Sequence, residues 1–190
     1  MAKANGSTRL VQPTAASRAA NLADFNAKMA TGKYEVGLSS ISSATGAYVA
    51  YMTGHQYHIE EMEAAKHLAD NGFNVELTPE GDGYEMYATN FSGGTHKYSE
   101  GTVSLLTFEQ KTPDHIENTL KQTVRGAIKH ANTKRSQIAL IYDRYSLFHR
   151  KDIEDGMKWY QKKDKAWRKK VKAVIVVNSK GEVYEHRFEE

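Results

Sequence analysis

The sequence predicts an α/β protein with a mixed central sheet flanked by helices. An amphipathic helix pattern covers residues 57–71. The short run QIALIYD at 137–143 is nearly all apolar, which is typical of a buried central strand. Near the end of the chain, VKAVIVV and EVYEHRF are joined by the turn NSKG, a pattern that predicts a hairpin. Helices that alternate with strands favour packing on a shared sheet.

Length and composition restrict the class of protein. The chain has 190 residues, enough for one domain with an appendage, and it has no cysteine for disulfides, Cys-zinc sites or thiol nucleophiles. No apolar run approaches the roughly 20 residues of a membrane span. The first 20 residues lack the apolar centre of a signal peptide. We therefore expect a cytoplasmic protein with no membrane partner.

The order of patterns predicts three parts. Residues 1–20 have no apolar period and predict a flexible leader. Residues 21–56 predict an N-terminal extension, with a short helix over 22–29 and a hairpin after it. Residues 57–190 predict the main α/β domain.

Within the main domain the expected elements alternate. After the first helix we expect strands at FNVEL, GYEMYA and GTVSLLTFEQK. Asp114 and Glu117 form a capping-box-like pair that predicts the start of a second helix, which continues to Ala131. A third helix is expected over residues 151–170.

Basic residues gather in one part of the chain. Residues 125–172 contain 15 Lys and Arg against five Asp and Glu, whereas the rest contains 11 basic and 18 acidic residues. Such a block indicates a surface for nucleic acid, because Lys and Arg contacts to phosphate dominate its affinity. The alternative is a solvated basic helix on an ordinary domain. The residues that we expect to bind nucleic acid are Arg125, Lys129, Lys158, Lys162 and Lys163.

Glu109 and Lys111 are the first candidates for chemistry. They end an apolar strand, and residues two apart in a strand share a face, so both side chains are expected to project into one cleft. A carboxylate that holds a divalent cation, beside an ammonium that offsets phosphate charge, suits phosphodiester hydrolysis. The alternative is a pair of alternating charges on an exposed strand.

Further acids come from the helix at 57–71 and from the turn EGDG. Glu61 lies four residues before Ala65 and borders the apolar stripe, where a carboxylate needs a cation or a hydrogen-bond partner. Asp82 lies in a Gly-rich turn that can bring a carboxylate near a metal. Glu61, Asp82 and Glu109 are therefore the expected metal ligands.

A family resemblance rests on these motifs. The run from Glu61 through Ala64-Ala65, Leu68-Ala69, Gly72 and Val75-Glu76 to Pro79 resembles the first helix and strand of C-terminal nuclease domains in contact-dependent growth-inhibition toxins. Those domains are a branch of the PD-(D/E)xK superfamily. LLTFEQKTP is similar to the acid-x-Lys strand of the superfamily, and the likeness spans residues 57–143.

The resemblance implies a restriction-endonuclease-like fold and a metal-dependent nuclease, a toxin-type RNase acting on tRNA. It makes Glu61 the acid on the helix, Glu109 and Lys111 the acid-x-Lys pair, and Asp82 the remaining acid, although no Pro-Asp dipeptide precedes it. It also implies Mg²⁺ or Mn²⁺ as cofactor, nucleic acid as substrate and a neutralising immunity-type protein as partner.

Other interpretations stay open. His55, His58 and His67 with Glu61 outline a zinc site, but no His-Glu-x-x-His motif is present. A metal-independent RNase would use His130 or His149 as base beside the basic block. A catalytically inactive nucleic-acid-binding or phage-structural protein on the same fold is the alternative from another class.

Overall fold

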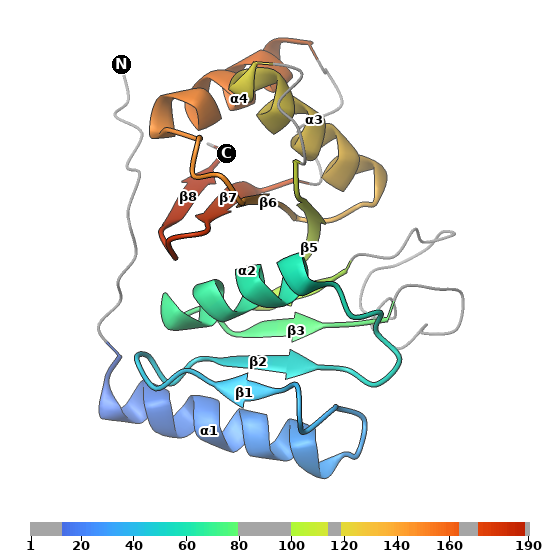
Figure 1. The fold of residues 1–190 in the computed structure, drawn as a ribbon, viewed down its shortest axis with the longest axis vertical. Helices are drawn as coiled ribbons and strands as arrows, with labels where there is room; N and C mark the ends of the chain where they lie inside the picture. The colour runs from blue at the N-terminus through green and yellow to red at the C-terminus, as the bar shows by residue number, and fades with distance from the viewer. Residues whose placement is uncertain (1–12, 80–99, 114–118, 164–170, 189–190) are drawn as a thin grey trace.

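The computed structural model describes residues 13–79, 100–113, 119–163 and 171–188. Over these ranges the chain forms four helices and eight strands (Figure 1). In chain order they are α1 (Ala15–Ala30), β1 (Ser40–Ile41), β2 (Tyr48–Tyr51), α2 (Ile59–Asp70), β3 (Val75–Leu77), β4 (Gly101–Val103), β5 (Leu106–Lys111), α3 (Leu120–Thr133), β6 (Ile138–Asp143), α4 (Arg150–Lys163), β7 (Ala173–Asn178) and β8 (Val183–Arg187).

All eight strands form one mixed sheet, in the order of the chain. Strands β2 and β3 are parallel, β4 is antiparallel to both of its neighbours, and β5, β6 and β7 are parallel. Strands β2, β3, β5, β6 and β7 therefore all end at the same edge of the sheet, which we call the carboxyl edge. In open α/β sheets this is the edge where ligands bind. The mixed α/β class predicted from the sequence is confirmed.

Helices cover both faces of the sheet (Figure 1). Helix α2 buries Met62, Ala65 and Leu68 against one face, together with side chains such as Phe108 and Leu140. Helices α3 and α4 pack on the opposite face, over residues such as Ala139. Helix α1 lies on that second face too, at the far end of the sheet over β1 and β2. None of the described helices is both long and apolar enough to cross a membrane.

The boundaries differ from the expected ones at both ends of the chain. Helix α1 begins at Ala15 rather than residue 22, because the Thr14 side chain accepts a hydrogen bond from the Ser17 backbone and caps it. It therefore includes residues expected in the leader. Strands β1 and β2, from the range expected as an N-terminal extension, are hydrogen-bonded into the same sheet as the other strands. Helix α4 is described to Lys163, and the rest of the range expected for it lies outside the described residues.

Two expectations fail between β3 and α3. The segment GTVSLLTFEQK is a hairpin, β4 and β5, and not one strand, because Ser104 and Leu105 adopt positive φ angles of 48° and 72° and reverse the chain. Helix α3 starts at Leu120, where Thr119 and Gln122 form the capping box. Asp114 and Glu117, the capping pair expected from the sequence, lie outside the described residues, as does GYEMYA.

Helices α3 and α4 cross closely at a glycine. A Cβ atom added at Gly156 would lie 2.5 Å from Val124 Cβ and 2.8 Å from the Lys121 carbonyl oxygen. Only a residue without a side chain fits there, so Gly156 sets the distance between the two helices.

We expect Gly156→Ala to destabilise the protein by about 1–3 kcal/mol, because the added methyl group forces the helices apart. Gly126→Ala in α3 is the matched control, since its Cβ would meet no heavy atom closer than Lys111 Nζ at 3.9 Å. Ala is the better helix former, so the control should gain up to about 1 kcal/mol. Urea denaturation measures both, and equal stabilities would contradict the close crossing.

Candidate functional site

Glu109 is a buried carboxylate at the carboxyl edge. It pairs in register with Ala139 of β6, so its side chain points to the face that α3 covers. The side chain is 3% exposed, and Glu109 Oε1 lies 2.7 Å from His130 Nε2 and 3.6 Å from Lys134 Nζ. A buried carboxylate needs such partners, because desolvation of an isolated charge is costly.

The partners of Glu109 come from the C-terminal end of α3, His130 from its last turn and Lys134 from its C-cap. His130 and Lys134 are four residues apart and therefore lie on the same side of the helix. The capping box at Thr119 and Gln122 secures the start of α3. Val124, Ala127, Ile128 and Ala131 bury the neighbouring stripe against the sheet. This packing fixes the rotation of the helix that presents His130 and Lys134 to β5.

Lys111 projects from the same face of β5 as Glu109. It pairs in register with Ile141, two positions beyond the partner of Glu109, and is itself exposed. Its Nζ atom lies beside α3, 3.9 Å from the position of a Cβ on Gly126. The described structure thus places one buried carboxylate, a half-exposed imidazole and two ammonium groups between β5 and α3.

Glu61 lies on α2, whose buried residues pack on the opposite face of the sheet. Its carboxylate Oε2 is 2.8 Å from His55 Nε2, and its side chain is 12% exposed. His55 Nδ1 lies 2.7 Å from the carbonyl oxygen of Thr78, which directly follows β3. Glu61 is therefore the half-buried acid that its spacing predicts, and its hydrogen-bond partner is His55.

A tyrosine supports this pair. The Tyr51 hydroxyl donates to the His55 carbonyl oxygen at 3.1 Å, and the two rings meet edge to face. Burial first, and then the charge of Glu61, raise the pKa of the Tyr51 hydroxyl, so it stays protonated and donates. The neighbouring acids of α2 have other partners, Arg144 for Glu60 and the Tyr142 hydroxyl for Glu63.

Glu61 and Glu109 thus share an edge of the sheet but not a face. His55 follows β2 and Thr78 follows β3, so the Glu61 pair lies at the carboxyl edge, as does the end of β5. The third expected acid, Asp82, lies outside the described residues. Among the residues that are described, no group of three or more His, Asp or Glu side chains is arranged to hold a metal.

The described donors do not by themselves fit Mg²⁺ or Mn²⁺. Magnesium takes six ligands, mostly oxygens from carboxylates, phosphates and water. Glu109 offers one carboxylate, and its neighbours within 4 Å include the cation Lys134 and the imidazole of His130. The zinc site considered for His55, His58, His67 and Glu61 reduces to the single His55–Glu61 contact among the described residues.

The basic residues expected to bind nucleic acid lie on α3 and α4. Lys129, Lys158 and Lys162 are exposed, and Arg125 is half-buried with its guanidinium carbon 5.2 Å from the centre of the Trp159 ring. Lys163 ends α4, and its side chain lies outside the described part of the chain. Lys121, which no sequence pattern singles out, also belongs to this group, with its Nζ 5.8 Å from the same ring centre.

Lys134 is a further functional residue that the sequence patterns do not single out, and they indicate His130 without its partner. The available signal was their spacing of four on a helix that follows the strand ending at Lys111. That spacing places them on one stripe, but it does not say which strand residue the stripe meets.

Comparisons with known proteins give one likeness in structure. No protein-family model matches the chain, and the search of curated proteins finds no match. Among solved structures, the chain is similar to the CdiA-CT/CdiI toxin and immunity complex from Burkholderia pseudomallei, with a TM-score of 0.49 and 16% sequence identity. The alignment covers 68% of this chain and 83% of that chain. We draw no conclusion about function from a likeness of this extent.

The His55–Glu61 contact predicts a difference between two substitutions. Glu61→Ala leaves a buried imidazole nitrogen without its partner, which should lower the free energy of unfolding by about 1–3 kcal/mol. Glu61→Gln should cost less than about 1 kcal/mol, because its amide can donate to His55 Nε2 while Nδ1 donates to Thr78. Thermal or urea unfolding measures both, and equal losses would contradict the contact.

Proposed function

We propose that the chain is a nuclease that cleaves phosphodiester bonds at the carboxyl edge of the sheet, with Glu109 and Lys111 at its centre. One observation carries the proposal. The buried carboxylate of Glu109 lies on the same strand face as Lys111 and 2.7 Å from the half-exposed imidazole of His130, beside helices rich in Lys and Arg.

The side chains present suit this chemistry. In this proposal the Lys111 ammonium neutralises the oxygen on which negative charge grows as the bond to phosphorus breaks. Glu109 holds and orients His130, whose ring is half exposed and so reaches a substrate as well as its buried partner. An imidazole oriented by a carboxylate is a common device for taking a proton from a nucleophile or giving one to a leaving group.

The metal remains a separate part of the proposal. It rests on the motif resemblance and on Asp82, and a bound divalent cation would supply charge stabilisation at the phosphate. Glu61 also stays in the proposal as an acid at the same edge. The resemblance further suggests a toxin-type RNase with tRNA as substrate and a neutralising partner protein, and the assays below include tRNA for this reason.

Cleavage assays test the centre of the site. We expect the wild-type chain to cut tRNA, other RNA or plasmid DNA, and Glu109→Gln to lose about 10²-fold or more of the rate while keeping its fold. Lys111→Ala should lower the cleavage rate by a similar factor. Lys66→Gln, on the other face of the sheet, should cleave at the wild-type rate. A Glu109→Gln variant with the wild-type rate would refute the proposal. Binding without cleavage by any variant would favour the inactive binding protein.

The same assay separates the roles of metal, His130 and Glu61. Loss of cleavage with chelator and recovery with Mg²⁺ or Mn²⁺ would establish the metal. Cleavage that survives the chelator but is lost in His130→Ala would establish acid–base chemistry without a metal. Loss of rate in the isosteric Glu61→Gln, at unchanged stability, would place Glu61 in the site, and an unchanged rate would remove it.

The basic face predicts a salt dependence. Lys129 is exposed on α3, so Lys129→Gln should weaken binding about equally for all sequences. The slope of log affinity against log salt should become shallower by up to about one unit. Lys66→Gln removes the same charge from α2 and serves as control. Filter binding by the inactive Glu109→Gln protein measures the slopes, and equal slopes would place the nucleic acid away from α3.

A further inference from the structure

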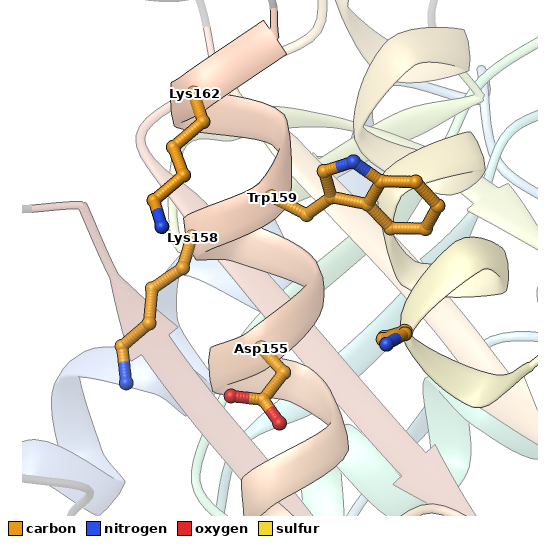
Figure 2. Close-up of a pocket in the computed structure, with 5 residues that line it drawn as sticks. Asp155, Lys158, Trp159 and Lys162 are labelled. Atoms are coloured by element: carbon orange, nitrogen blue, oxygen red, sulfur yellow. The ribbon is translucent and has the colours of Figure 1, made fainter.

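A pocket of about 340 Å³ opens between α3 and α4, and Glu109 is not among the residues that line it. Figure 2 shows Trp159 reaching from α4 toward α3, with Asp155, Lys158 and Lys162 projecting from the same helix. Lys121 of α3 completes the lining. This volume lies at the small end of ligand pockets, which run from about 300 to 1,000 Å³.

Trp159 holds cations in place at this pocket. Lys121 Nζ lies 5.8 Å and the Arg125 guanidinium carbon 5.2 Å from the centre of its ring. Both distances are within the roughly 6 Å over which a cation is attracted to an aromatic face. The two side chains lie one helical turn apart on α3, so the indole restrains their charges before any ligand binds.

The lining has the chemistry of a nucleotide site. Lys121, Lys158 and Lys162 give it three ammonium groups against the carboxylate of Asp155 and that of Glu154, which lies 4.0 Å from Lys158, so it favours an anion. Trp159 is half-buried and forms part of the wall, so indole surface faces the void. A flat base that stacks on an aromatic ring, joined to phosphates that contact lysines, uses both features. An acidic peptide or a free anion uses the lysines alone.

Helix α3 connects this pocket to the candidate active site. Lys121 and Arg125 lie on the flank of α3 that meets α4, whereas His130 and Lys134 lie on the flank that meets β5. The exposed Lys129 lies on the outer surface between the two flanks. A helix with its side chains is about 10–12 Å across. A nucleic-acid strand lying over α3 therefore spans both sites within a few nucleotides.

We propose that the pocket binds one nucleotide of the substrate strand, a few nucleotides away from the bond that is cut. The base stacks on Trp159, and neighbouring phosphates contact Lys121, Lys158 and Lys162. The inference rests on the proposed function and extends it: the pocket positions the strand and sets the length of substrate that the protein needs. These are positioning residues and take no part in bond cleavage.

Binding is tested first, without cleavage. The protein carries Glu109→Gln, and Trp167→Phe removes the other of its two tryptophans, so the tryptophan fluorescence comes from Trp159 alone. A single-stranded oligonucleotide of about eight nucleotides should quench it, and inorganic phosphate at the same phosphate concentration should not. The exposed change Lys121→Gln should weaken this binding several-fold, and Lys66→Gln should leave it unchanged. No quenching, or quenching by phosphate alone, would overturn the proposal.

Cleavage then tests the positioning role. Trp159→Leu should raise KM about tenfold for long oligonucleotides and change kcat much less, whereas Trp159→Phe, which still stacks, should stay near wild type. The wild-type preference for long over dinucleotide substrates should shrink in Trp159→Leu. A fall in kcat alone would overturn the positioning role. Quenching without any cleavage would refute the nuclease and leave the pocket supported, and cleavage without quenching would refute the pocket alone.

Discussion

The burial of the Glu109 carboxylate is the constraint that organises this half of the molecule. Its side chain is 3% exposed between β5 and α3, so the folded chain must surround it with donors. His130 and Lys134 meet this need only if α3 lies over β5 in one rotation. That rotation turns Lys121 and Arg125 toward α4 and leaves Lys129 on the outside. The contacts of the buried charge and the apolar stripe of α3 thus require the same rotation, which decides where the basic residues of α3 are displayed.

The second constraint is the close crossing of α3 and α4 at Gly156. Gly156 has no side chain that would overlap Val124 and the Lys121 carbonyl. The two helices can therefore approach closely, and Trp159 reaches across to α3. Without that approach the indole would not contact cations of the other helix. Backbone packing therefore determines a feature of the surface, the pocket lined by Trp159 and three lysines.

The elements with the strongest periodicity are the ones that the sequence predicts. The stripe from Met62 to Ala69 and the apolar runs of β6 and β7 were identified, because burial imposes the helical and strand periods directly on the sequence. The break at Ser104 and Leu105 was missed, since neither residue is a usual turn former at positive φ. Helix α3 starts later than expected because Thr119 and Gln122 provide the cap.

For the candidate site, spacing predicted which side chains share a face but not what they meet. Alternation placed Glu109 and Lys111 on one side of β5, and periodicity placed Glu61 at the border of the α2 core. Their partners, His130 and His55, depend on how α3 rotates on the sheet and how the chain turns after β2. Such long-range contacts leave no local pattern in a single sequence.

The charges around Glu109 indicate what kind of ligand suits the site. The Glu109 carboxylate contacts the imidazole of His130 and the ammonium of Lys134, and Lys111 lies on the same strand face, so these four side chains together carry more positive than negative charge. A phosphodiester carries a negative charge, so its binding lowers the electrostatic energy of this group of side chains. A divalent cation does the opposite unless further carboxylates accompany it. These residues by themselves therefore favour the binding of a phosphate. The binding of a metal ion depends on acids from elsewhere in the chain or on the phosphate oxygens themselves.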